Sequence, residues 1–177
     1  YSFILNDEPI SMLAIPGMMD VGIELNSLSK SHNMAGWRIG ALLGQSEFLN
    51  PVLKFKSNMD SGMFLGLQKG ATAALSLGKP WFERQNEVYT SRRKLVWALA
   101  DQLGLTYDPN ATGLFVWCRV PEGTTAEGLV DHLLYEKNIF ITPGKIFGSA
   151  GNDFVRISLC LQEFKILEAI NRIKPTL

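Results

Sequence analysis

The stretch SLSKSHNMAGWRIG, residues 27–40, decides how this sequence is interpreted. It joins two short apolar runs, 22–28 and 38–44, which we expect to be strands. Lys30 directly follows the first run and Arg38 opens the second, so both cations should emerge near one edge of a sheet, among several serine hydroxyls. Such a set of donors suits an anion, and a phosphate is the natural ligand.

A lysine in this setting can also act as a nucleophile. A second cation nearby and partial removal from water both favour the uncharged amine, which is the form that makes a Schiff base with an aldehyde. On spacing alone, a solvated Lys30 and a capping or paired Arg38 explain the same residues, so that alternative stays open at this point.

Another arginine lies in the last third of the chain. Arg156 sits in the otherwise apolar run 154–161, after the segment PGKIFG, residues 143–148. A charge buried in a strand is costly unless an anion pairs with it, and the planar fork of arginine fits a carboxylate with two hydrogen bonds. The partner is either an Asp or Glu of the same fold or a bound ligand.

The first stretch resembles the cofactor-lysine signature of the class I and II aminotransferases, which are fold-type-I pyridoxal-phosphate enzymes. The shared pattern is a serine three residues before the lysine and then glycine, aromatic, arginine, apolar, glycine. The resemblance implies that Lys30 carries pyridoxal 5'-phosphate as a Schiff base, while Ser27 and Arg38 bind its phosphate. Tyr1 is similar to the family tyrosine that hydrogen-bonds the cofactor ring oxygen. The PG..FG and VRIS segments resemble those of the family arginine, here Arg156, that binds the substrate α-carboxylate.

The other patterns predict an α/β protein. Apolar spacing predicts helices at 64–77, 81–103, 125–137 and 162–173, and strands at 1–5, 105–107, 113–120, 140–142 and 154–161. The weak alternation of the first runs is typical of a parallel sheet covered on both faces. By resemblance we expect the C-terminal part of a fold-type-I transferase. It would comprise a remnant of the large-domain mixed or parallel sheet, residues 1–88, and an α+β small domain, residues 89–177.

The composition restricts the kinds of partner. Seventeen basic and seventeen acidic residues balance, which gives no support to a nucleic-acid or membrane partner. Cys118 and Cys160 lie in apolar runs without metal-ligand spacing, so we expect no metal and two buried free thiols of a cytoplasmic protein.

The resemblance implies transfer of an amino group between an amino acid and a 2-keto acid, in a homodimer. The family aspartate that pairs with the pyridine nitrogen has no counterpart in these residues, so we expect a fragment that is inactive alone. Two alternatives remain: a carbon–sulfur lyase or synthase that uses pyridoxal phosphate on the same fold, and a ligand-sensing domain of a transcription regulator. Product analysis tests the first, and a DNA-binding module upstream would indicate the second.

Overall fold

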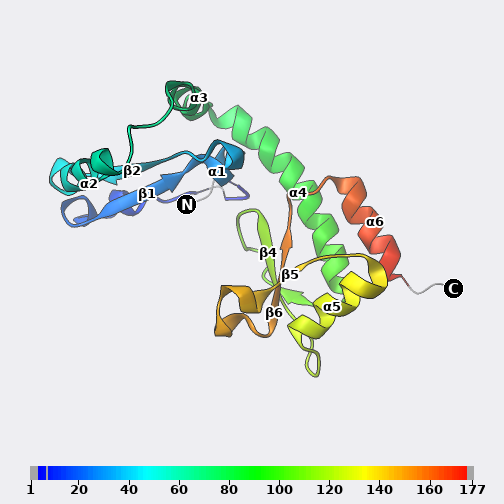
Figure 1. The fold of residues 1–177 in the computed structure, drawn as a ribbon. Coiled ribbons are helices and arrows are strands. Elements are labelled where there is room, and N and C mark those ends of the chain that lie inside the picture. Colours follow the sequence, from blue (N-terminus) through cyan, green and yellow to red (C-terminus); the bar gives the residue numbers. More distant parts are fainter. Residues whose placement is uncertain (1–3, 7, 175–177) are drawn as a thin grey trace. The chain divides into compact units, whose positions relative to one another are not determined.

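The computed structural model describes residues 4–6 and 8–174 (Figure 1). Tyr1 lies outside the described residues. Two compact units make up the chain, the first ending at Glu83 and the second beginning at Arg84, and each is described by itself. This boundary falls inside helix α4, Lys79–Gln102. The assignment of residues 1–88 and 89–177 to two domains stays a proposal.

The first unit contains an antiparallel strand pair, two longer helices and several short helical turns. In chain order the elements are η1 Met12–Ala14, η2 Met18–Asp20, β1 Ile23–Ser27, α1 Leu28–Ser31, η3 Ala35–Trp37, β2 Gly40–Gly44, α2 Ser46–Met59 and α3 Leu65–Leu75. Ile4 and Leu5, which the sequence assigns to a strand, lie in a turn instead.

Strands β1 and β2 pair antiparallel, with Ser27 opposite Gly40 and Ile23 opposite Gly44. The helices and strands of the described residues confirm the α/β class. Every strand pairing among these residues is antiparallel, and none is parallel. The reason lies in residues 28–39, where α1 and η3 turn the chain back so that consecutive strands become neighbours.

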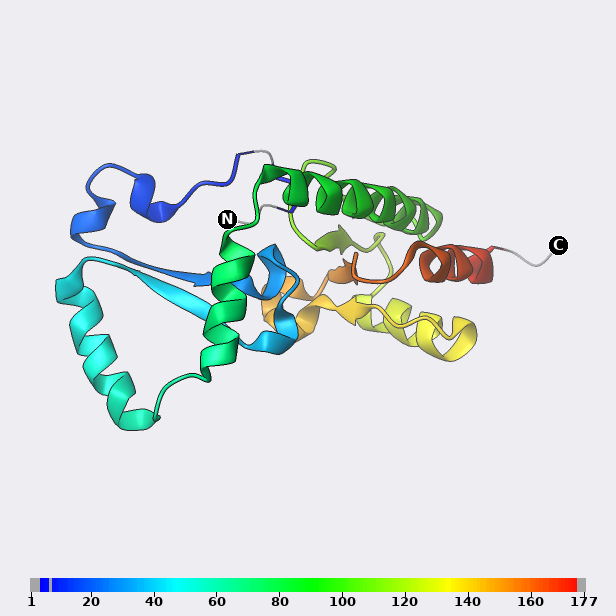
Figure 2. The same cartoon turned by 90° about the horizontal axis from the view of Figure 1, so that it is seen from above.

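A small apolar core fixes this connection to α3. Leu28, Met34 and Ile39 are buried with Ala71 of α3, and Leu67 and Ala74 pack against them. Figure 2 shows α3 crossing the segment that follows β1. The loop between the two strands is therefore packed against helix α3 in a defined position.

Helix α2 buries none of its residues. Its exposed apolar side chains include Leu53, Phe55 and Met59. Pro51 lies inside it, a residue that usually kinks or ends a helix, and the sequence pattern does not reveal this element.

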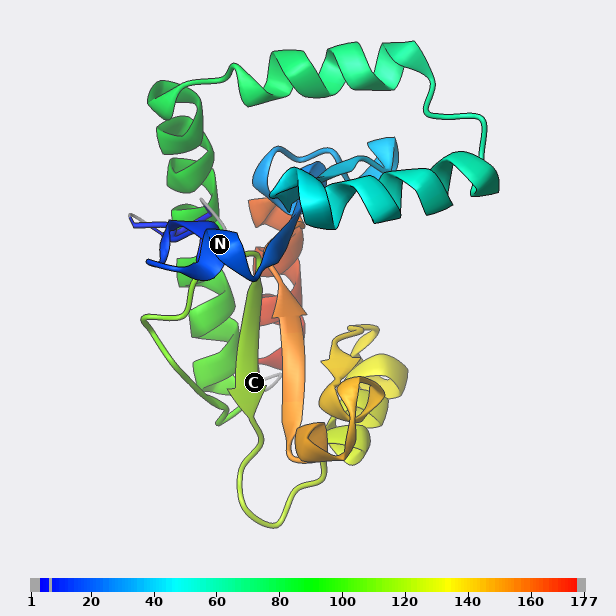
Figure 3. The ribbon, with the colours of Figure 1, turned by 90° about the vertical axis from the view of Figure 1, so that its left-hand side faces the viewer.

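The second unit is an α+β layer structure. After α4 come β3 Thr106–Tyr107, β4 Phe115–Arg119, α5 Ala126–Lys137, β5 Thr142–Pro143, η4 Gly144–Phe147, η5 Ser149–Gly151, β6 Phe154–Ser158 and α6 Glu163–Ile173. The sheet order is β3-β4-β6-β5, and Figure 3 shows β4 and β6 side by side. This architecture agrees with the predicted small domain.

One face of this sheet is core and the other is open. Alternate strand residues such as Val116, Val155 and Ile157 are buried, as are Val96 of α4 and Ile166 of α6. Arg92 of α4 ties the start of α6 to this core, because its Nε lies 3.2 Å from Glu163 Oε1 and its Nη1 donates to the Leu159 carbonyl. The intervening strand residues project from the opposite face.

The two cysteines differ in environment. Cys118 is buried on β4, and burial raises the pKa of its thiol to about 12. Cys160 is exposed because it lies beyond the end of β6, so the prediction of a buried thiol is wrong there. None of the described helices combines the length and apolar character that crossing a bilayer would need.

Glu24 gives the first unit a pH-dependent contact. This buried carboxylate of β1 accepts hydrogen bonds from Ser11 Oγ at 2.7 Å and from the Met12 N–H at 2.8 Å. The Ser11 hydroxyl, and then the backbone donors, hold the pKa of Glu24 below its ordinary value. Its contribution to stability is therefore present above its unfolded pKa of ~4.3 and is lost as pH falls through the folded pKa.

Glu24→Gln should weaken this contact, because a neutral amide accepts weaker hydrogen bonds than a carboxylate. At pH 7 we expect several-fold faster hydrogen exchange in the peptide containing Met12 and Leu13, and this difference should shrink as the pH falls below 4. Exchange mass spectrometry of variant and wild type at matched pH measures it, with Glu47→Gln on exposed α2 as control. Equal exchange at pH 7 would contradict the assigned role.

Candidate functional site

Lys30 stands one turn beyond the end of β1. The Ser27 hydroxyl caps α1 by accepting a hydrogen bond from the Ser29 N–H at 3.2 Å, which is how a serine begins a helix. Helix α1 is a single turn and ends at His32, whose N–H donates to the Leu28 and Lys30 carbonyls. The exposed Lys30 side chain is thus carried on a short, capped turn directly at the strand end.

Arg38 returns the chain to the same end of the strand pair. It follows η3 in a left-handed conformation, φ 52° and ψ 45°, which is uncommon for a residue other than glycine. The Leu28 N–H donates to the Ile39 carbonyl at 3.3 Å, and Ser27 is the strand partner of Gly40. Backbone pairing therefore brings the segments carrying Ser27, Lys30 and Arg38 together.

These residues form a donor set with a definite chemistry. A primary amine, a hydroxyl and a guanidinium lie on neighbouring backbone segments, and all three side chains are exposed. The Arg38 guanidinium donates to the Ala35 carbonyl of its own loop at 3.2 Å. Hydroxyl and guanidinium donors suit a phosphate, and an amine suits an aldehyde, so the set fits a ligand that carries both.

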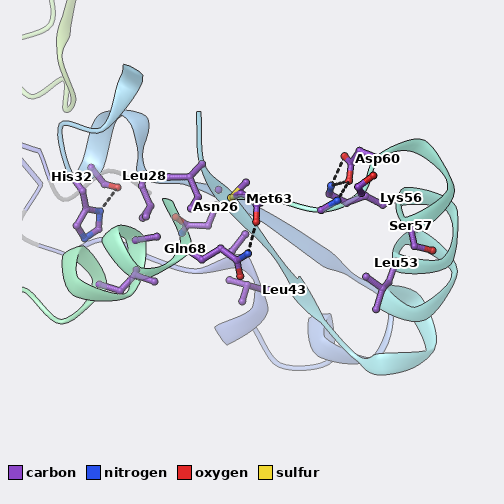
Figure 4. A pocket seen from close by; sticks show the side chains of 18 residues that line it. Asn26, Leu28, His32, Leu43, Leu53, Lys56, Ser57, Asp60, Met63 and Gln68 are labelled. Carbon is purple, nitrogen blue, oxygen red and sulfur yellow. Dashed lines mark hydrogen bonds and ion pairs between the residues drawn. The ribbon is translucent and has the colours of Figure 1, made fainter. Parts of the chain in front are cut away.

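A cavity of about 750 Å³ is lined partly by residues next to Lys30 and Arg38, namely Leu28, Ser31, His32, Ile39 and Gly40. Its lining includes Asn26, Leu43 and Met63, whereas Ser27, Lys30 and Arg38 do not line it. Figure 4 shows Gln68 donating to the Met63 carbonyl and, at the far end, the Lys56–Asp60 ion pair. Asn26 and Ser27 are consecutive strand residues and point to opposite faces, so Asn26 reaches this cavity whereas Ser27 does not.

His32 has a larger structural role than the sequence indicates. It is buried, its Nδ1 lies 2.8 Å from Ser31 Oγ, and its ring stacks on Trp81 at 5.8 Å and meets Phe82 edge-on at 5.4 Å. Burial lowers the pKa of His32, so the ring is neutral at neutral pH. Trp81 and Phe82 lie far along the chain from His32, so the motif around Lys30 does not reveal these ring contacts.

Arg156 lies in the second unit, on the open face of the sheet. It is half-buried on β6, opposite Trp117 of β4 and Thr142 of β5. Its guanidinium carbon lies 4.2 Å from the centre of the Phe115 ring and 4.4 Å from that of Phe147. Contact with two aromatic faces holds the cation by cation–π attraction and leaves its fork for an anion.

No Asp or Glu of the described residues forms an ion pair with Arg156. The described part of the chain therefore lacks the internal salt bridge that was one of the two alternatives for Arg156. The surroundings of this guanidinium suit a carboxylate ligand. Sequence reasoning did not single out the two flanking phenylalanines. The signal for Phe147 was its place in the PG..FG segment, and the signal for Phe115 was its place in the run 113–120.

Residues 4–6 and 8–174 contain no group of three or more His, Cys, Asp or Glu side chains arranged to hold a metal ion.

Comparison with known proteins now adds to this geometry. The family model described as aminotransferase class I and II matches residues 7–173. The LL-diaminopimelate aminotransferase of Oleidesulfovibrio alaskensis is 42% identical over 168 residues, which are 95% of this chain and 43% of that protein. The enzyme of the same name from Aquifex aeolicus is 39% identical, with the same shares covered. The chain thus spans less than half the length of these relatives.

Solved structures agree. The structure of an aminotransferase from Staphylococcus aureus matches with a TM-score of 0.85 and 35% identity, over 98% of this chain and 46% of that one. The aromatic aminotransferase of Pyrococcus horikoshii matches with a TM-score of 0.86 and 30% identity, over 97% and 47%. Sequence, family model and fold agree with the lysine–arginine motif, and the chain belongs to the class I and II aminotransferase family.

Proposed function

We propose that the full-length protein containing this sequence is a pyridoxal-phosphate-dependent aminotransferase, which moves an amino group between an amino acid and a 2-keto acid. Lys30 holds the cofactor covalently, Ser27 and Arg38 bind its phosphate, and Arg156 binds the substrate carboxylate. Tyr1, outside the described residues, keeps its expected contact with the cofactor ring oxygen as part of this proposal. The observation that carries the proposal is the pairing that joins the Lys30 and Arg38 segments at one end of β1 and β2.

The chain's own residues supply holding, orienting and proton transfer. Pyridoxal phosphate, when bound, supplies the electron-withdrawing ring that stabilises negative charge at the substrate α-carbon. Ser27 and Arg38 anchor the phosphate, which fixes the distance of the aldehyde from Lys30. Arg156 orients the amino acid by its carboxylate. Lys30 Nζ, as a neutral amine, would act as the base that takes the α-proton of the bound amino acid.

The relatives suggest which substrate to test first. Two relatives that are 42% and 39% identical to this chain are named LL-diaminopimelate aminotransferase. We therefore propose LL-diaminopimelate as the first amino donor, with an aromatic amino acid as comparison because one matching structure is an aromatic aminotransferase. Formation of a keto acid and of aminated cofactor distinguishes transfer from a lyase or synthase reaction, which would release ammonia or a thiol.

Borohydride trapping tests the proposal directly. Reduction of the full-length protein with bound pyridoxal phosphate should fix the cofactor to a single lysine, and peptide mass mapping should find it at Lys30. A label on another lysine, or no label, would refute the assignment. An activity assay on the same protein tests the alternative of a ligand-sensing domain. Turnover in a protein that also carries the label on Lys30 would exclude that alternative.

The homodimer and the cytoplasmic location are also part of the proposal. Exposed apolar side chains of α2, such as Phe55 and Met59, support a second copy as the surface that covers them. The free thiols of Cys118 and Cys160 support a reducing compartment. Analytical ultracentrifugation of the full-length protein measures the first, and cell fractionation measures the second.

A further inference from the structure

Helix α3 contains a glycine that its own geometry does not require. Gly70 lies within Leu65–Leu75, where glycine is less favourable than any residue except proline, and its φ is not in the left-handed region. A Cβ built on Gly70 would lie 2.4 Å from Cζ3 of the Trp37 indole and 3.1 Å from its Cη2. The absent side chain therefore makes room for a rigid ring.

That ring belongs to the residue directly before Arg38. Arg38 holds a left-handed backbone conformation, which a residue other than glycine keeps only where its surroundings impose it. The buried cluster of Leu28, Met34, Ile39 and Ala71 already packs the loop that carries Arg38 against α3. The indole of Trp37 against Gly70 adds a second contact to the same helix, next to the arginine itself.

We propose that Gly70 is a positioning residue for Arg38: by lacking a Cβ it lets the Trp37 indole lie against α3, and this contact holds the Arg38 guanidinium where it binds the cofactor phosphate. The inference rests on the proposed function, because it assigns the phosphate to Arg38. Gly70 itself touches no ligand. Its effect should therefore appear in recognition of the phosphate group and not in recognition of the aldehyde.

The test compares two ligands that differ only in the phosphate. Apparent Kd values of pyridoxal 5'-phosphate and of pyridoxal are measured by absorbance on the full-length apoprotein. Gly70→Ala should raise the Kd of the phosphorylated ligand roughly tenfold, the order of one hydrogen bond to a charged group, and change the Kd of pyridoxal less than about twofold. Gly78→Ala is the matched control, because a Cβ there meets only Pro80 Cδ at an ordinary 3.7 Å.

A double variant tests whether Gly70 acts through the Trp37 indole. Trp37→Leu removes the ring and should reduce the preference for the phosphorylated ligand in the same way, while Gly70→Ala in the Trp37→Leu background should have no further effect. Should Gly70→Ala fail to fold by circular dichroism, Trp37→Leu alone decides. An unchanged preference in Trp37→Leu, or an undiminished Gly70→Ala effect without the indole, overturns the inference.

The wild type separates this inference from the function on which it depends. A wild-type protein that carries the borohydride label on Lys30 while Gly70→Ala and Trp37→Leu leave the ligand preference unchanged refutes only the role of Gly70. A wild-type protein without affinity for pyridoxal phosphate refutes both.

Discussion

Lys30→Ala should abolish transamination and the borohydride label together. The Lys30 amine is proposed both to hold the cofactor and to take the α-proton, and no other lysine lies on the capped turn at the end of β1. A positioned acid–base group alone contributes roughly 10²- to 10⁴-fold, so kcat should fall by at least about 10³-fold when both roles are lost. Steady-state assays and mass mapping on the full-length variant measure the two losses.

The control for this experiment is Lys54→Ala, because Lys54 is exposed on α2, away from the end of the strand pair that carries Lys30. Its kcat and label should match those of the wild type. Near-normal turnover in Lys30→Ala would exclude Lys30 as the cofactor lysine. Partial recovery of turnover with added small amines would support it, since a diffusible base replaces the missing one.

Arg156→Ala should cost about 2–5 kcal/mol in kcat/KM, the usual range for removing one partner of a desolvated charge pair. The loss should be specific to the carboxylate. Amino acids and the matching amines without a carboxylate should become equally poor substrates, because the group that distinguishes them is gone. Arg156→Lys should recover only part of the loss, since an ammonium lacks the planar fork.

Arg119→Ala serves as the matched control. Arg119 lies on the neighbouring strand β4, is exposed and sits 3.9 Å from the exposed Asp153, a pair that contributes little. Its kcat/KM should stay close to the wild-type value. An Arg156→Ala enzyme that still prefers amino acids over amines would show that another group binds the carboxylate.

Local patterns predicted the helices well. The expected helices at 81–103 and 125–137 correspond to α4, Lys79–Gln102, and α5, Ala126–Lys137, which the Thr125 hydroxyl caps by accepting a hydrogen bond from the Gly128 N–H. Amphipathic spacing, caps and breakers are properties of neighbouring residues, so a sequence displays them. Helix α2 lacks a buried face and contains Pro51, and it therefore left little periodic signal.

Contacts between segments that lie far apart in the chain were harder to predict from the sequence. The order β3-β4-β6-β5 and the antiparallel pairing of β1 with β2 depend on which segments meet in space. The motif around Lys30 and Arg38 identified the residues of the candidate site, because its spacing is specific. It did not reveal the contact of His32 with Trp81, the fit of Trp37 on Gly70, or the rings beside Arg156. Those are packing relations between distant segments.

The aromatic setting of Arg156 has a consequence for proton linkage. A guanidinium paired with an internal acid would exchange one carboxylate for another on binding, and the displaced acid would change its affinity for protons. Phenyl rings carry no ionisable proton, so the contacts with Phe115 and Phe147 place no titrating group beside Arg156. Docking of a carboxylate on Arg156 therefore displaces no internal acid, and this contact by itself should release no proton to the buffer.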